Sequence, residues 1–208
     1  MMFSKPFLCV ITDEALCPVT LAEEALKGGA AMIQLRHKAA SGSQLFIWAV
    51  EIRKRCQQYH ALCMINDRVD IALASKADGV HLGQQDMPAR AARKLLGELG
   101  IIGVTASSPE EALQAQQDGA NYIGFGHIYP TRSKLKDSSP LGLDILQKTA
   151  TLVSLPILAI GGINHENAAS VIAHGASGIA VISAVSRAHD PSMAAGELVR
   201  AIHNNGTL

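Results

Sequence analysis

The sequence predicts a single α/β domain over residues 1–208, folded as a (β/α)8 TIM barrel. Three observations lead to this fold. Short apolar runs alternate with longer amphipathic stretches, and each run is apolar on both faces, as in parallel strands covered by helices. Eight such runs occur within 208 residues, a length near the lower limit for a barrel of this kind.

Each apolar run is expected to form one strand. In chain order these strands are residues 7–12, 31–36, 61–66, 79–82, 101–105, 122–126, 156–160 and 179–183. The stretches between them carry apolar residues at three- and four-residue spacing, which is typical of amphipathic helices. The clearest helical patterns are residues 45–57, 109–118 and 143–152.

Turn residues support the same division. Pro88 and Pro109 suit the start of a helix, and Ser108 offers an N-cap side chain. Glycines precede four of the strands, and each is expected to end a helix in the left-handed conformation. These glycines are the pair Gly28-Gly29, Gly79, Gly119 and Gly175.

An open, doubly wound sheet is the alternative architecture. Such a sheet usually has fewer strands and often a glycine-rich turn after the first one. Here the first strand ends in Thr12-Asp13-Glu14, without that glycine pattern. The barrel is therefore favoured.

Composition excludes several classes of function. Lys plus Arg equals Asp plus Glu at 18 each, so no overall field favours nucleic acid or an acidic membrane surface. No run approaches ~20 apolar residues, so a membrane span is not expected, and the start lacks a secretory pattern. The cysteines form neither a zinc pattern nor a Cys-x-x-Cys pair, which favours a reducing, cytoplasmic location.

Cationic residues follow the second expected strand. Gln34, Arg36 and Lys38 point to one side if the strand geometry continues past its end. In a TIM barrel the C-terminal ends of the strands carry the chemistry, and two cations there suit a phosphorylated ligand. The alternative is a solvated strand end with ordinary basic residues.

Two acidic residues follow the third and fourth expected strands. Asp67 comes directly after Asn66, and Asp86 follows Leu82 by four positions. Carboxylates on adjacent strand ends can share one Mg2+, which commonly takes one or two carboxylates plus phosphate oxygens and water. The alternative for each aspartate is capping of the helix that follows it.

A long polar loop follows the sixth expected strand. Residues 131–140 are expected to form a lid, and Lys134 within it could bring a third cation to a phosphate group. The loops after strands seven and eight contain Gly161, Gly162 and Ser183, where barrels of this kind frequently bind phosphate through backbone N–H groups. Two anion-binding regions indicate two phosphorylated substrates, or one ligand phosphorylated at both ends.

Taken together, these segments resemble the thiamine phosphate synthase family, also called thiamine-phosphate pyrophosphorylase. The resemblance covers essentially the whole chain. Its motifs are Gln-Leu-Arg-His-Lys at 34–38 and residues 65–70, 79–86, 122–126, 129–131 with Lys134, 159–163 and 180–184.

The resemblance implies the substrates and a role for each site residue. It implies that a hydroxymethylpyrimidine diphosphate is condensed with a thiazole phosphate, or its carboxylated form, by a dissociative mechanism that uses Mg2+. The implied contacts to the diphosphate, which are also the catalytic residues, are Arg36, Lys38, Asn66 and Lys134. The implied Mg2+ ligands are Asp67 and Asp86. The implied contacts near the pyrimidine are Gln34 and Thr105, and those to the thiazole phosphate are Thr131, Ser133, Gly161, Gly162, Ile182 and Ser183.

Two positions depart from the family pattern. Ser107 stands where members often carry histidine, and His127 stands where many carry proline and is assigned no role. The related thiazole tautomerases depend on the histidine that Ser107 replaces, so the retained diphosphate and metal residues favour the synthase. A ligand-sensing relative without catalytic activity and other phosphate-binding barrels are the remaining alternatives. The expected partners are small phosphorylated pyrimidine and thiazole substrates, with no nucleic acid and no membrane; homodimerisation is left open.

Overall fold

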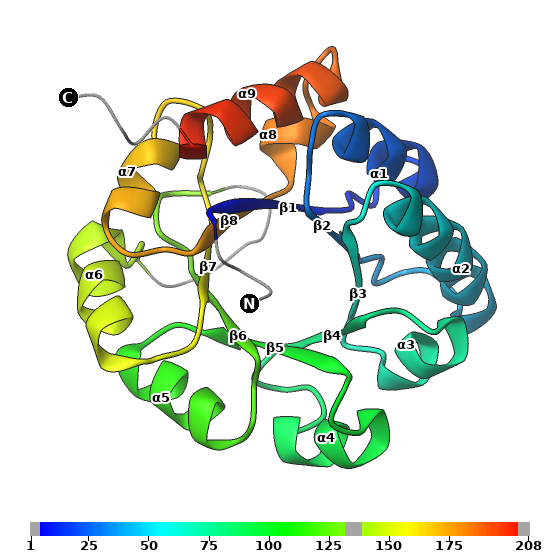
Figure 1. The fold of residues 1–208 in the computed structure, drawn as a ribbon, viewed down its shortest axis with the longest axis horizontal. Coiled ribbons are helices and arrows are strands. Elements are labelled where there is room, and N and C mark those ends of the chain that lie inside the picture. Colours follow the sequence, from blue (N-terminus) through cyan, green and yellow to red (C-terminus); the bar gives the residue numbers. More distant parts are fainter. Residues whose placement is uncertain (1–4, 132–138, 204–208) are drawn as a thin grey trace.

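The computed structural model describes residues 5–131 and 139–203, and these form a closed barrel of parallel strands (Figure 1). The strands follow the chain order around the barrel, and β8 pairs with β1 to close it. Their bounds are β1 Phe7–Ile11, β2 Met32–Leu35, β3 Leu62–Asn66, β4 Gly79–Leu82, β5 Ile101–Ala106, β6 Tyr122–Gly126, β7 Ile157–Ile160 and β8 Gly178–Val181. The predicted (β/α)8 barrel is thus confirmed, and the open sheet is excluded.

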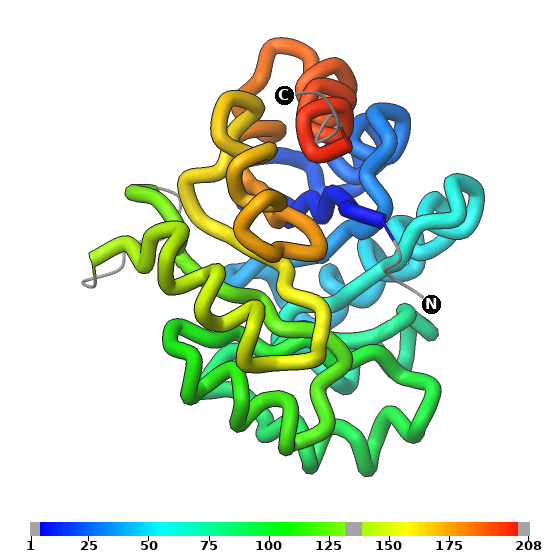
Figure 2. Tube along the Cα trace, turned by 60° about the vertical axis from the view of Figure 1, so that its left-hand side comes forward, coloured from blue at the N-terminus to red at the C-terminus, as the bar shows by residue number. Residues whose placement is uncertain are grey.

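Helices surround the barrel on its outside (Figures 1 and 2). Their bounds are α1 Pro18–Lys27, α2 Gly42–Gln58, α3 Val69–Ser75, α4 Ala89–Leu96, α5 Pro109–Gln117, α6 Gly142–Leu152, α7 Ala168–Ala173, α8 Ser183–Ser186 and α9 Pro191–His203. Helix α9 packs between α1 and α7 and covers β1 from outside. Among the described residues, no helix has the length and apolar character needed to cross a membrane.

Several of the predicted helix ends are confirmed. The Ser108 side chain accepts a hydrogen bond of 3.2 Å from the Glu111 backbone N–H at the start of α5, as an N-cap does. Gly29, Gly119 and Gly175 have positive φ angles of 92°, 87° and 95°, as expected of residues that end helices.

The prediction for Gly79 was wrong. Helix α3 ends at Ser75, and its C-cap residue Lys76 takes the left-handed conformation with a φ of 56°. Gly79 is the first residue of β4, where a Cβ atom would lie 2.0 Å from the carbonyl oxygen of Ile101. Its glycine is required because β4 and β5 approach closely at this point, and not because a helix ends there.

The inside of the barrel changes from apolar to polar along its axis. A buried cluster fills the interior with Phe7, Cys9, Ile11, Met32, Met64, Ile101, Tyr122, Leu158 and Ala180. Burial of each large side chain of this kind contributes about 1.5–3 kcal/mol. Toward the C-terminal ends of the strands, the inward positions become polar, with Gln34, Asn66, His81 and Thr105. The polar surface therefore lies at the C-terminal end of the barrel, next to its packed apolar interior.

Candidate active site

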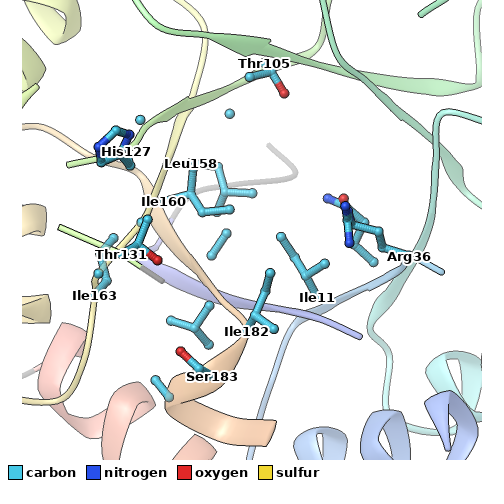
Figure 3. Close-up of a pocket in the computed structure, with 18 of the residues that line it drawn as sticks. Ile11, Arg36, Thr105, His127, Thr131, Leu158, Ile160, Ile163, Ile182 and Ser183 are labelled. Atoms are coloured by element: carbon cyan, nitrogen blue, oxygen red, sulfur yellow. The ribbon is translucent and has the colours of Figure 1, made fainter. Parts of the chain in front are cut away.

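A cavity of about 500 Å³ opens at the C-terminal ends of the strands, which is the end where TIM barrels carry their sites. Its size lies in the range of ordinary small-molecule pockets. In Figure 3, Arg36 stands on one side of the cavity, and His127 and Thr131 stand on the other. Apolar side chains, including Ile11, Leu158 and Ile160, form the wall between them.

Most of the residues predicted from the sequence line this single cavity. They are Gln34, Arg36, Asn66, Thr105, Thr131, Gly161, Gly162, Ile182 and Ser183. Lys38, Asp67 and Asp86 lie outside the lining but form a group of their own beside Asn66. Ser133 and Lys134, with most of the predicted lid, lie outside the described residues.

The segment carrying Arg36 is held by the end of β1. The Thr12 hydroxyl donates to the Arg36 carbonyl at 2.9 Å and accepts from the Arg36 N–H at 2.8 Å. Glu14 Oε1 accepts from Arg36 Nη1 and from the Lys38 backbone N–H, both at 3.0 Å. The guanidinium therefore enters the cavity from a backbone that is fixed on both sides.

Lys38 points elsewhere than expected. Strand β2 ends at Leu35, and the alternation of side chains that carries Gln34 and Arg36 into the cavity does not extend to Lys38. Its ammonium group instead forms an ion pair with Asp67.

Asp67 and Asp86 lie side by side, and neither caps a helix. The N-cap residue of α3 is Arg68 and that of α4 is Pro88, and neither helix has a side-chain cap. The Asp86 carboxylate accepts a 2.7 Å hydrogen bond from the Gly83 N–H instead. Burial, and then the neighbouring Asp86 carboxyl, raise the pKa of Asp67 above its ordinary value, although Lys38 opposes this shift.

This aspartate pair fits a hard divalent cation. A bound cation would relieve the cost of holding two carboxylates together in a partly buried place. Among the described residues, no three His, Cys, Asp or Glu side chains gather to hold a metal, so the pair would supply only part of the ligand shell. Mg2+ commonly keeps water and substrate oxygens in the rest of its shell.

The opposite side of the cavity includes two glycines that expose backbone. Gly161 and Gly162 have φ angles of 100° and 67°, which side chains rarely adopt. A Cβ on Gly161 would lie 2.3 Å from Cβ of His127, and one on Gly162 would lie 2.5 Å from the carbonyl oxygen of Pro130. Asn167 fixes the turn by donating from Nδ2 to the Gly162 carbonyl at 3.0 Å. At these two positions, main chain and not side chain therefore faces the cavity.

Comparison with known proteins identifies the family. Residues 8–185 match the family described as thiamine monophosphate synthase. The chain belongs to this family. Like its relatives named thiamine-phosphate synthase, the chain is a transferase of thiamine biosynthesis.

Individual members of the thiamine monophosphate synthase family align along nearly their whole length. Thiamine-phosphate synthase from Chlorobium limicola is 57% identical over 205 residues, covering 99% of this chain and 98% of that protein. Its counterpart from Chlorobium phaeovibrioides is 61% identical over 201 residues, covering 96% of each. The structure of thiamine phosphate pyrophosphorylase from Pyrococcus furiosus superposes with a TM-score of 0.92 at 42% identity, covering 100% of both chains.

Four polar residues of this synthase-family cavity were not assigned a role from the sequence. They are His81, His127, Asn164 and Arg187. His81 occupies an inward position of β4, which strand alternation could have identified. Arg187 follows the short helix α8, and no sequence pattern points it at the cavity.

Proposed function

We propose that this chain condenses 4-amino-2-methyl-5-hydroxymethylpyrimidine diphosphate with 4-methyl-5-(2-phosphoethyl)thiazole, or its carboxylated form. The products are thiamine phosphate and pyrophosphate. One observation carries the proposal beyond family membership. A single cavity has a cation at one side, with an aspartate pair next to it, and glycine backbone at the other. Such a cavity can hold two phosphorylated rings with their reacting ends facing each other.

The Arg36 side binds the diphosphate in this proposal. Arg36 presents a planar fork, Asn66 an amide, and Lys38 a positive charge beside the aspartate pair. Lys134 is proposed as a further cation, although it lies outside the described residues. These groups act mainly on the transition state, because the leaving pyrophosphate gains negative charge as its bond breaks.

Asp67 and Asp86 are proposed as the ligands of Mg2+. Their closeness and the raised pKa of Asp67 support this assignment. When bound, Mg2+ would add positive charge that stabilises the departing pyrophosphate.

The rings occupy the middle and far side of the cavity. Gln34 is almost fully buried, and its amide can both donate to a pyrimidine ring nitrogen and accept from the exocyclic amino group. Thr105 lines the same cavity and is proposed to lie near the pyrimidine as well. The thiazole phosphate is proposed to bind Thr131, Ser133, Gly161, Gly162, Ile182 and Ser183.

The reaction needs no nucleophilic side chain. The C–O bond of the pyrimidine methylene breaks, and both electrons leave with pyrophosphate. The thiazole nitrogen then forms the new C–N bond with its lone pair. The apolar wall of Leu158, Ile160 and Ile182 excludes water, which would otherwise capture the methylene cation.

A thiazole tautomerase is the nearest alternative, and Ser107 argues against it. Ser107 lies outside the cavity lining, and its backbone N–H donates to Glu111 at 2.6 Å. It therefore cannot serve as the acid–base group that those isomerases depend on.

The free cysteines also support a cytoplasmic location.

The test is a coupling assay with both phosphorylated substrates, with and without Mg2+. We expect thiamine phosphate and pyrophosphate in equal amounts, and neither after chelation of the metal. Asp86→Asn should abolish turnover, whereas Asp70→Asn is the matched control, because Asp70 is exposed and pairs with Arg68 away from the cavity. A folded protein that releases no pyrophosphate in the presence of Mg2+ would overturn the proposal.

A further inference from the structure

A chain of hydrogen bonds runs from the buried interior of the barrel to the cavity. The Tyr122 hydroxyl lies 2.9 Å from Nδ1 of His81, and Nε2 of the same ring lies 2.9 Å from the Thr105 hydroxyl. Tyr122 is fully buried in the interior cluster, whereas His81 and Thr105 line the cavity. Figure 3 shows Thr105 at the cavity edge. The chain therefore connects a residue that substrate cannot touch with one that it can.

Sheet register and two glycines make this chain fit. His81, Gly103 and Tyr122 are aligned across β4, β5 and β6, and Thr105 aligns with Gly124 in the next row. A Cβ on Gly103 would lie 2.1 Å from Cζ of Tyr122, and one on Gly124 would lie 2.6 Å from Cε1 of His81. The two rings can thus meet above these glycines only because both positions lack a side chain.

The phenol of Tyr122 can serve as the donor at the buried end of this chain. Burial, with a smaller effect of Cys9, raises the pKa of Tyr122 well above its ordinary value, so its oxygen keeps its proton. A phenol proton donated to Nδ1 leaves the His81 proton on Nε2, because a neutral imidazole carries only one. Nε2–H then donates to Thr105, and the Thr105 hydroxyl proton is directed to another acceptor.

We propose that Tyr122 is a positioning residue that acts through His81 to make the Thr105 hydroxyl a donor toward the pyrimidine diphosphate. This inference rests on the proposed function. The acceptor is a lone pair of that substrate, on a ring nitrogen or a diphosphate oxygen.

The first test needs neither substrate nor variant. Nitrogen NMR of the folded protein reports which ring nitrogen of His81 carries the proton. We expect Nε2–H in the wild type and a loss of this preference in Tyr122→Phe, which keeps the ring and removes the donor. Tyr59→Phe is the control, because Tyr59 is exposed at the end of α2. A wild-type His81 protonated at Nδ1 overturns the proposal.

The second test is kinetic. Tyr122→Phe should lower kcat about tenfold, the effect of one ordinary hydrogen bond, while Tyr59→Phe should not. In a Thr105→Val background, Tyr122→Phe should cost nothing more, because its effect passes through Thr105. Independent effects of the two substitutions, or a Tyr122→Phe kcat equal to that of the control, overturn the positioning role. If the wild type itself is inactive, the proposed function fails, while the NMR result still judges the hydrogen-bond chain.

Discussion

The Ser186 hydroxyl donates a hydrogen bond of 2.7 Å to Oδ2 of Asp13, and so joins two residues that are 173 positions apart. The bond supports the closure between β1 and β8. It is the largest cause that lowers the pKa of Asp13 below its ordinary value of 3.8, followed among the lowering causes by the Ala15 N–H and the charges of Arg187 and Arg36. Both arginines line the cavity, so the residue that bonds to Ser186 at the barrel closure also interacts electrostatically with the cationic groups of the cavity.

Ser186→Ala should therefore lower stability in a pH-dependent way. Because the pKa of Asp13 is lower in the folded protein, ionised Asp13 stabilises the fold above pH 3.8, and this contribution is lost as pH falls through the folded pKa. We expect a loss of about 1 kcal/mol at pH 7, since Asp13 is partly exposed, and a smaller loss toward pH 3. Urea unfolding of the wild type and of Ser186→Ala between pH 3 and pH 7 measures this loss. Ser43→Ala, at an exposed position, is the control. A difference that does not change with pH contradicts the assignment.

Asp67→Asn should separate stability from activity. The raised pKa of Asp67 means that its charge is disfavoured in the fold, so a neutral amide should leave the free energy of unfolding unchanged or raise it. Asparagine also tolerates the φ of 61° at this position, where alanine would be strained. Turnover should fall more than a hundredfold. Thermal unfolding and the coupling assay measure the two effects; a loss above about 2 kcal/mol would indicate a structural role instead.

Thr12→Val should weaken diphosphate binding, although Thr12 itself is not a proposed substrate contact. Valine keeps the shape but removes both hydrogen bonds to the Arg36 backbone at a position that is 1% exposed. We expect about 1–3 kcal/mol of lost stability, because the Arg36 backbone groups lose their partner. The KM for the pyrimidine diphosphate should rise several-fold, while that for the thiazole phosphate should not. Thr151→Val, which removes an exposed helical hydroxyl, is the control. Equal changes in both KM values would argue against a local effect.

The fold could be predicted from the sequence because hydrophobic periodicity and turn residues are local features of the sequence. Strands β4 and β6 were predicted with their observed bounds, since the apolar run and its flanking turn define each of them. Adjacent strand ends also predicted that Asp67 and Asp86 would come together. The prediction for Gly79 was wrong because an Asp-Gly pair has the same local pattern at a helix end and at a close contact between strands.

What the sequence did not predict depends on register and on side-chain direction. The approach of Tyr122 to His81 requires that both align with Gly103 across three strands, and no local pattern encodes that alignment. Lys38 turned toward Asp67 because β2 ends at Leu35, three residues before it. Arg187 reaches the cavity through the turn after α8, a four-residue helix with no periodicity to recognise.

Gly103→Ala should show how tightly the barrel interior is fitted around Tyr122. The added Cβ would lie 2.1 Å from Cζ and 2.4 Å from the hydroxyl oxygen of Tyr122, inside a ring of packed strands that cannot easily move. We expect a loss of about 1–3 kcal/mol in the free energy of unfolding, typical of an overfilled core. Gly196→Ala is the matched control, because its Cβ would meet only Arg200 Nη1 at 3.6 Å and the Gly28 carbonyl oxygen at 3.7 Å. Gly196 lies within α9, where alanine favours the helix. The control should be neutral or slightly stabilising in urea unfolding. Equal stability of the two variants would mean that the interior can shift to accept the methyl group, and that the contact between Gly103 and Tyr122 does not fix the ring.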